Sequence, residues 1–488
     1  MKSQIKHFID KKSLRMFALG FSAGLPILLV FSTLSVWLTK ADIERSTITL
    51  FSWVGFAYSF KFLWSPIVDH LQLPMSKYFG HRKTWLLLSQ IMLILSILLA
   101  SLSDPKISLM FMVISFILIA FSSATQDITI DAFRIESVKQ SLQGVMSSMY
   151  LGGYRIAMIF SGAGSLWLVS KLSGETYDLQ SWQLVYKIMA VLMIVGLLAT
   201  LFSDEPNIKR KKIGNHFEQL KFIVIIIISI FIFFSILLNL PKLIFETKFM
   251  SFGYNLLKIL ISFIALLASL KLISKFGLIN NKKTTIVYIK PMLDFINRYK
   301  KLALIILLLI SIYRISDIVM GVMANIFYVE KGYTLNDIAF YSKFVGLIAT
   351  ITGGVIGGLC SMRFGSLKAL LFGSIIAAIT NLLFAYLAIS ENNIFLLASI
   401  IIADNLASGF AGAAFIVYLS SLTSIKFTAT QYALFSSLML FFPKLIAGYS
   451  GAIVDIYGYA NFFIISAILG LPVIFLILFL DKFGIYRK

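Results

Sequence analysis

Residues 108–136 read SLMFMVISFILIAFSSATQDITIDAFRIE, an apolar run that ends in a short series of charged side chains. A bilayer core about 30 Å thick needs roughly 20 apolar residues per helix, so this run is long enough to cross it. Asp127, Asp131 and Arg134 recur at i, i+4 and i+7, which places them on one face of a helix. An ionised side chain at the bilayer centre costs about 2.5 to 3.5 kcal/mol, so that face must meet protein or water. The stretch therefore predicts a membrane-spanning helix that helps to line a polar interior.

The composition of the whole chain agrees with a membrane location. Of its 488 residues 59% are hydrophobic and only 13% are charged, and the mean hydropathy is +0.91. Soluble domains carry about 25% charged residues. The single cysteine, Cys360, excludes an intrachain disulfide and a thiolate metal cluster. The four histidines lie outside the apolar runs, so a haem held by two histidines between helices is also excluded. We expect no metal and no cofactor.

Fourteen apolar runs of spanning length divide the sequence, which predicts an all-α polytopic membrane protein with 14 transmembrane helices. The expected spans are residues 16–39, 47–68, 84–102, 108–132, 143–170, 182–203, 222–240, 252–273, 301–328, 335–360, 368–389, 394–419, 429–455 and 460–480.

The distribution of basic residues predicts how these spans are oriented. If the N-terminus is cytoplasmic, 29 Lys and Arg residues lie on that side of the membrane and seven lie on the other. Cytoplasmic loops are enriched in Lys and Arg, so both termini are expected in the cytoplasm. The formal net charge of +21 is then a topology signal, and no nucleic-acid partner is needed to explain it.

The spans fall into two sets of six with two more between them. The sets predict an N-terminal six-helix bundle over residues 1–203 and a C-terminal one over residues 301–488. Residues 204–300 are expected to hold cytoplasmic linkers, two inserted spans and a short surface helix in PMLDFINRYKK, residues 291–301. A charged linker is the alternative interpretation of that last segment. Two parallel six-helix repeats are typical of transporters that hold their substrate at the interface between the repeats.

Ionisable residues inside the spans are the main functional signal. Unpaired, they would together cost on the order of 20 to 30 kcal/mol in lipid, so we expect them to converge on one hydrated interior. A short loop joins the fourth and fifth spans, so Asp127 or Asp131 could approach Arg155. The alternative is a set of buried ion pairs that only fix helix packing, such as Arg314 with Asp317 at i, i+3. These residues are Lys61, Asp127, Asp131, Arg155, Arg314, Asp317, Lys343, Asp404 and Lys444.

Several quoted stretches carry a family resemblance. The first half contains GFSAGLPILL (20–29), KFLWSPIVD (61–69), ATQDITIDAFRIE (124–136) and GYRIAMIFSG (153–162). The second half contains PMLDFINRYKK (291–301), YRISDIVMGVMANIFYVEKGY (313–333), the long stretch from Asp404 to Leu438 and GYSGAIVDIYGYANFF (448–463). With these motifs the chain resembles the AmpG-type muropeptide permeases, a branch of the major facilitator superfamily. It departs from the family pattern at Ser316, where Gly is usual, and at Asp404, where Glu is frequent.

The resemblance implies the major facilitator fold and a function. It implies proton-coupled import of anhydromuropeptides, the sugar peptides released by cell-wall turnover, across a bacterial inner membrane by alternating access. The expected partners are this sugar-peptide substrate, protons and membrane lipid, and the expected state is a monomer. Such a ligand carries carboxylates, an amine and many hydroxyls, which suits an interior of mixed charge.

The polar residues then receive provisional roles. A proton carrier needs a carboxylate whose pKa differs between two conformations; the leading candidates are Asp127 and Asp131, followed by Asp317 and Asp404. Substrate binding is assigned to Lys61, Gln126, Arg155, Arg314, Lys343 and Lys444. The turn SPIVDHLQLPMSKYFGHRK (65–83) resembles the superfamily's short cytoplasmic loop after the second span, so Asp69 and Arg82 are assigned to gating. In this turn Pro66 replaces the usual glycine.

Three rival functions remain open. A carrier of another anionic metabolite, such as acetyl-CoA, would use the same cationic interior. A polytopic enzyme is disfavoured because the sequence contains no metal-ligand cluster, no nucleophile beside a base and no G-x-x-x-x-G-K-[ST] motif. A sensor that kept a transporter fold without transporting is the third alternative.

Overall fold

The computed structural model describes residues 9–43, 52–173, 176–208, 290–333, 337–447 and 449–483, together with separate positions between 224 and 269. In these ranges the regular structure is entirely helical. The helices of the first half are α2 (Lys11–Leu28), α3 (Leu34–Lys40), α5 (Phe56–Phe60), α6 (Ser65–His70), α7 (Ser76–Phe79), α8 (His81–Ala100), α9 (Leu109–Ser137), α10 (Gln143–Ile159), α11 (Ser165–Ser173), α12 (Leu179–Leu192) and α13 (Ile194–Leu201). The later helices are α17 (Lys290–Tyr299), α18 (Ala303–Ile312), α19 (Ile315–Glu330), α21 (Gly346–Phe364), α22 (Ser366–Ile389), α23 (Ile394–Leu422), α24 (Thr428–Ala447), α25 (Ser450–Ile468) and α26 (Leu471–Lys482).

Ten helical segments among the described residues are long and apolar enough to cross a membrane, judged by length and composition. The spans predicted at 222–240 and 252–273 fall largely outside the described residues, and the segment predicted at 429–455 is not among the ten. The count of 14 is therefore not confirmed and stays a prediction.

The span predicted at 47–68 is not one continuous helix where the structure describes it. It forms from α5, a 3₁₀ turn over Lys61–Leu63, and α6. Pro66 stands in the first turn of α6, where its missing N–H leaves no helical bond unmade. The proline ring would also clash with the carbonyl group four residues earlier in a continuous α-helix, so an uninterrupted helix through this point is disfavoured. The break is what positions Lys61.

The turn expected between the last two spans is present inside α25. Gly458 has a φ of +74°, in the left-handed region that side chains with a Cβ rarely adopt. The helix is interrupted there, so α25 consists of two helical parts, before and after Gly458.

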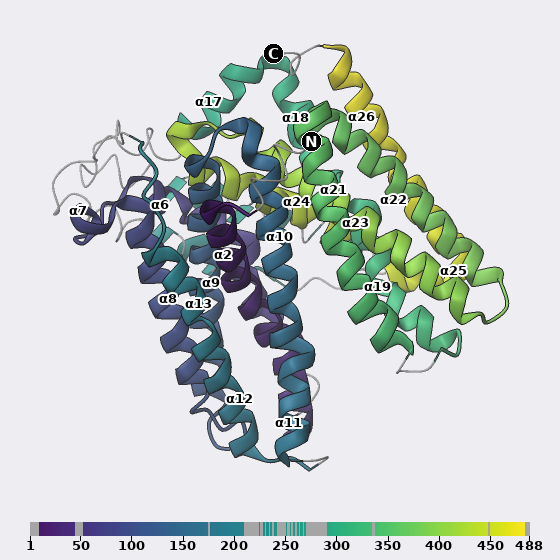
Figure 1. Cartoon of the computed structure of the whole chain (residues 1–488), viewed down its shortest axis with the longest axis horizontal. Coiled ribbons are helices and arrows are strands. Elements are labelled where there is room, and N and C mark those ends of the chain that lie inside the picture. Colours follow the sequence, from purple (N-terminus) through teal and green to yellow (C-terminus); the bar gives the residue numbers. More distant parts are fainter. Residues whose placement is uncertain are drawn as a thin grey trace.

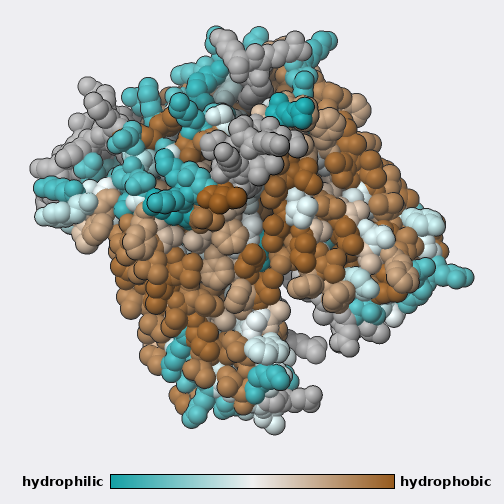
Figure 2. Space-filling view, viewed as in Figure 1, coloured by the Kyte–Doolittle hydropathy of each residue, from teal (hydrophilic) through white to brown (hydrophobic). Residues whose placement is uncertain are grey.

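Each half has its own apolar core. The largest buried cluster contains residues of the first half together with Phe233, Leu266, Ala429 and Ala433. Two other clusters lie in the second half, one of them joined by Ile135. Figure 1 shows the two bundles in contact near the ends of α6, α10, α21 and α24 and diverging toward α11, α12, α19 and α25. In Figure 2 a notch separates the two lobes below their contact, and the sides of both lobes are apolar.

Candidate functional site

Asp131 on α9 lies between two cations in the first half. Its Oδ2 is 3.8 Å from the Lys61 Nζ, and its Oδ1 is 3.6 Å from the Arg134 Nη2. These three side chains are at least 90% buried, so each charge depends on the others for compensation. The break between α5 and α6 brings Lys61 to α9. The helical stripe read from the sequence brings Asp131 and Arg134 to the same face.

Asp127 lies one turn before Asp131 on the same helix. Its Oδ1 is buried and has no hydrogen-bond partner among the described residues. Tyr58, whose hydroxyl is likewise buried, lies within electrostatic reach of Asp127. Within the described ranges Asp127 and Asp131 make no ion pair with Arg155, and Lys61 is the cation from another helix that meets Asp131.

Arg134 extends this cluster to the second half. Its Nη1 donates to the Ser420 Oγ on α23 at 2.9 Å and to the Ser147 Oγ on α10 at 3.2 Å. Its guanidinium also lies over the ring of Tyr432 on α24, 5.2 Å from the ring centroid. Sequence reasoning placed Arg134 on the polar stripe of α9 but gave it no function. Its position at i+7 from Asp127 was the available signal.

Arg155 and Arg314 come from opposite halves and lie within electrostatic reach of each other. Arg155 is on α10, and its Nε is buried without a partner in the described part of the chain. Arg314 stands at the break between α18 and α19, close enough for its charge to act on Arg155. A Cβ on Gly412 of α23 would lie 3.7 Å from the Arg314 Nη1 and 3.9 Å from Leu151 of α10, so Arg314 sits where the two bundles meet. Two guanidinium groups within electrostatic reach of each other repel, and together they favour an anion.

The second half also supplies two carboxylates near Arg314. The Asp317 Oδ2 lies 3.1 Å from the Arg314 Nε, which is the i, i+3 pair expected from the sequence. Asp404 accepts a hydrogen bond from the Thr380 Oγ1 at 3.2 Å and lies within electrostatic reach of both members of that pair. The side chains of Arg314 and Asp317 keep 21% and 17% of their surface exposed, so the pair remains open to solvent or to a ligand.

The remaining residues assigned to substrate binding are less central. Gln126 is fully buried in the first half and accepts a hydrogen bond from the Ser22 Oγ on α2 at 3.0 Å. Lys444 is exposed on α24, directly after Pro443. The side chain of Lys343 lies outside the described residues.

A second polar cluster links the two halves at one end of the molecule, and because gating was predicted for two of its members we call it the gate: Asp69, Arg82, Glu136, Ala429 and Thr430. The Arg82 Nη2 donates to Asp69 and to Glu136, both at 2.7 Å. The carboxylate of Asp69 accepts hydrogen bonds from the Ala429 and Thr430 backbone N–H groups at 3.0 and 2.8 Å and from the Thr430 Oγ1 at 2.7 Å. An acidic residue of one half thus caps the first turn of α24 in the other.

The surroundings of Asp69 keep its carboxylate ionised. Burial on its own would raise the pKa of Asp69, but the charge of Arg82 and the donated hydrogen bonds outweigh burial and lower that pKa to about 2. The backbone N–H groups of Arg82 and Lys83 donate to Glu205 at 2.9 and 3.0 Å. Sequence reasoning selected Asp69 and Arg82 and missed the glutamates, which stand near the ends of other helices.

Close packing of α10 against α21 holds the same end together. A Cβ on Gly144 would lie 2.4 Å from the Gly358 carbonyl oxygen, and one on Gly358 would lie 2.6 Å from that of Gly144. The Ser148 Oγ donates to the Gly354 carbonyl oxygen at 2.8 Å. The contact therefore requires glycine on both helices.

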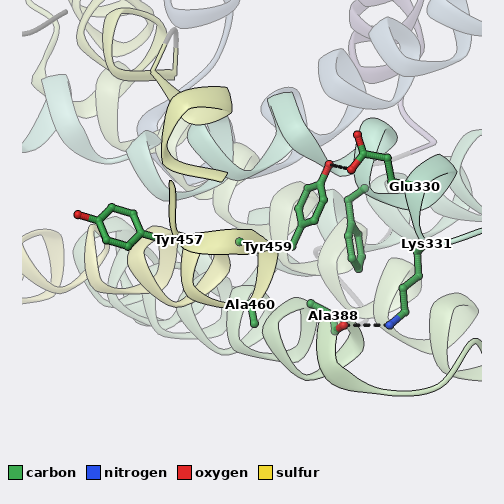
Figure 3. Close-up of a pocket in the computed structure, with 8 residues that line it drawn as sticks. Glu330, Lys331, Ala388, Tyr457, Tyr459 and Ala460 are labelled. Atoms are coloured by element: carbon green, nitrogen blue, oxygen red, sulfur yellow. Dashed lines mark hydrogen bonds between the residues drawn. The ribbon is translucent and has the colours of Figure 1, made fainter. Parts of the chain in front are cut away.

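A separate cavity of about 410 Å³ lies at the far end of the second half (Figure 3). Its polar groups bond to neighbours: the Tyr459 hydroxyl donates to Glu330 at 2.8 Å, and the Lys331 Nζ donates to the Ala388 carbonyl oxygen at 2.9 Å. None of the residues assigned to proton coupling, substrate binding or gating lines it. Among the residues that the structure describes, no group of three or more possible metal ligands lies together.

Comparison with known proteins gives consistent matches. The family model of the Major Facilitator Superfamily matches residues 16–448. The transporter AmpG 4 of Rickettsia conorii is 30% identical over 476 residues, 98% of each chain. The anhydromuropeptide permease of Escherichia coli K12 is 28% identical over 480 residues, 98% of this chain and 82% of that protein.

Solved structures of low sequence identity share the fold. The proton:xylose symporter XylE matches with a TM-score of 0.57 at 12% identity, over 99% of this chain and 96% of that one. The E. coli fucose:proton symporter FucP matches with a TM-score of 0.58 at 10% identity, over 96% and 98%.

Proposed function

The chain belongs to the Major Facilitator Superfamily and, within it, to the AmpG transporters, and from this premise we propose that it imports anhydromuropeptides by proton symport. It is a multi-pass membrane transporter and not an enzyme. The proposed substrate follows from the name of the E. coli relative. The proposed site lies between the two bundles, and the proposed membrane is the inner membrane of a bacterium.

The observation that carries this proposal is the pair Arg155 and Arg314. The first comes from α10 and the second from the break between α18 and α19, so one ligand held by both would bridge the halves. A peptide carboxylate accepts hydrogen bonds from guanidinium groups in a bidentate geometry. The buried Arg155 Nε has no partner in the described residues, and a ligand carboxylate would supply one. Asp317 and Asp404 stand nearby for the amine of the same ligand.

Proton coupling is assigned to the cluster on α9. Asp131 is held by Lys61 and Arg134, so its negative charge compensates two cations. Asp127 has an oxygen without a partner in the described residues and is the better placed of the two to exchange a proton. Arg134 links the cluster to Ser420 and Tyr432. A proton taken up near Asp127 can therefore affect the contact between halves.

The gate supports an alternating-access cycle. If the end that carries it is cytoplasmic, as the distribution of basic residues predicts, this structure faces outward. Substrate would then enter through the notch of Figure 2. Opening the gate requires Asp69 to leave the first turn of α24, and closing the other side would complete the cycle.

The proposal is tested by uptake into energised proteoliposomes. Arg155→Gln should lower the uptake of a labelled anhydromuropeptide at least about tenfold, because a buried charge-assisted hydrogen bond contributes about 1.5 to 3 kcal/mol. Arg15→Gln is the matched control, since Arg15 pairs with Asp204 on the surface and its loss should leave uptake unchanged. Uptake by Arg155→Gln equal to that of the unaltered protein would contradict the assignment.

The same assay separates the main alternative. Two arginines within electrostatic reach of each other would also suit the phosphates of an anionic metabolite such as acetyl-CoA. Unlabelled acetyl-CoA in excess should leave muropeptide uptake unchanged. Strong competition by acetyl-CoA together with weak competition by wall fragments would favour the alternative carrier.

A further inference from the structure

Helix α17 is the last part of the link between the two halves, and it is attached to the second half. Its residues Pro291 and Phe295 are buried, while Met292, Leu293 and Ile296 are exposed. The Phe295 ring lies 5.1 Å from that of Phe435 on α24, measured between centroids. The buried side of α17 therefore packs against the helix whose first turn receives Asp69.

Arg298 fastens the end of α17 to two later segments. Its Nη1 donates to the Leu422 carbonyl oxygen at the end of α23 at 2.9 Å, and its Nη2 donates to the Gln431 Oε1 at 3.0 Å. Its Nε bonds to Asp294 one turn earlier at 3.0 Å, which fixes the guanidinium on the helix. One of these donors therefore bonds to a carbonyl group at the end of α23, where carbonyls lack partners within the helix. Another links α17 to α24.

Gln431 completes the connection. It is 2% exposed, and its Nε2 donates to the Pro291 carbonyl oxygen at 2.8 Å and to Asp294 at 3.1 Å. Its Oε1 also accepts from the Ser424 N–H at 2.7 Å. One buried amide thus joins both ends of α17 to the turn that precedes α24.

The same turn of α24 holds the gate. Ala429 and Thr430, which bind Asp69, directly precede Gln431. The position of the two N–H donors is consequently set by the bonds of Gln431. The backbone between α17 and α18 supports this reading, because Lys300 has a φ of +49°. Such a conformation is unfavourable in a residue with a side chain and persists where surrounding contacts impose it.

We propose that Arg298 and Gln431 are positioning residues of the gate, and that α17 couples the linker between the halves to the transport cycle. By fixing the position of the first turn of α24, they hold the Ala429 and Thr430 N–H groups where Asp69 accepts hydrogen bonds from them. The inference rests on the proposed alternating-access function and goes beyond it, since it makes the linker a determinant of how often the gate is closed.

The test measures the distance across the gate directly. In a Cys360→Ser background, Lys77→Cys and Lys426→Cys place spin labels on exposed positions beside the gate, one in each half. Pulsed electron paramagnetic resonance on protein in nanodiscs gives the ratio of closed to open molecules. Arg298→Ala should lower that ratio at least about fivefold, Arg298→Lys should restore part of it, and Lys301→Ala should leave it unchanged. Lys301 is exposed, and its substitution removes the same positive charge three residues later in the chain.

Each outcome has a separate meaning. Asp69→Asn, which removes the acceptor itself, should lower the ratio at least as much as Arg298→Ala. If Asp69→Asn opens the gate and Arg298→Ala does not, the positioning role of Arg298 is overturned, while the gating role of Asp69 is supported. If neither variant changes the ratio, the gate and the proposed cycle fail together. If Arg298→Ala lowers the melting temperature but leaves the ratio of closed to open molecules unchanged, Arg298 has a structural role only and the proposal is overturned. Should Arg298→Ala not fold, Gln431→Met is measured in its place, with the same expected drop and the same contradiction.

Discussion

At the scale of single residues, the structure separates two aspartates that the sequence could not distinguish. Asp127 and Asp131 share one face of α9, and helical spacing alone predicts equal access to the interior. They differ because Lys61 pairs with Asp131. Lys61 lies at least 66 positions before either aspartate, and the break between α5 and α6 brings it to α9. Long-range pairing of this kind leaves no local pattern.

The two aspartates should therefore respond differently to amidation. Asp127→Asn should abolish accumulation against a gradient, because the proton site is lost, while keeping substrate exchange in de-energised vesicles. Asp131→Asn should destabilise the protein by about 3 to 5 kcal/mol, because two buried cations lose their shared partner. Uptake, exchange and thermal melting measured on the same preparations check both.

A surface carboxylate provides the control. Asp42→Asn removes a carboxylate that lies 3.8 Å from Lys106 in an exposed pair, so it should alter neither accumulation nor melting. Accumulation by Asp127→Asn at the level of the unaltered protein would remove Asp127 from the coupling mechanism.

The pKa of Asp69 predicts how the gate depends on pH. A carboxyl whose pKa is lowered by folding contributes stability above its ordinary pKa of about 3.9. That contribution is lost as the pH falls through the folded value of about 2. The closed fraction reported by the spin labels should stay constant from pH 8 to 5 and fall only in strong acid. In Asp69→Asn it should be low throughout. Because Asp127 is the proposed proton site, the same measurement is made in Asp127→Asn, and opening between pH 7 and 5 in that variant would show that this account of Asp69 is wrong.

At the scale of elements, hydropathy predicted most helices of the described residues to within a few positions. The runs expected at 368–389 and 394–419 correspond to α22 and α23, for example. The short helix expected in PMLDFINRYKK is α17. The prediction of a continuous helix from the length of an apolar run failed where proline and tertiary contacts interrupt the helix. The segment that carries Lys61 and Pro66 is the example. The contact of α10 with α21 could not be predicted either, because the sequence does not distinguish glycines that pack within one half from glycines that pack between the halves.

That contact gives a prediction at the same scale. Gly358→Val should open the gate end, because even a Cβ at this position would lie 2.1 Å from the Ser148 Oγ. Spin-label distances should shift toward the open state and uptake should fall. Gly321→Val is the matched control, since a Cβ on Gly321 meets nothing within 4 Å. An unchanged distance distribution for Gly358→Val would mean that α10 and α21 separate without consequence for the gate.

At the scale of the whole molecule, the sequence predicted two six-helix bundles from the number and grouping of its apolar runs. It predicted a polar interior from the cost of charge in lipid. It could not predict which residues join the bundles. Arg134 with Ser420, and Asp69 with Ala429, pair across 286 and 360 positions. Those pairs depend on which end of the molecule is closed, and a single sequence must encode more than one such arrangement for transport.

The most direct test of the account is a double-mutant cycle on ligand binding by Arg155 and Arg314. Affinity of the purified protein for an anhydromuropeptide is measured by isothermal titration calorimetry for Arg155→Gln, Arg314→Gln and the double variant. If both arginines hold one ligand between the halves, the three losses should be non-additive by about 1 kcal/mol or more. Additive losses, or unchanged affinity in either single variant, would contradict a shared site.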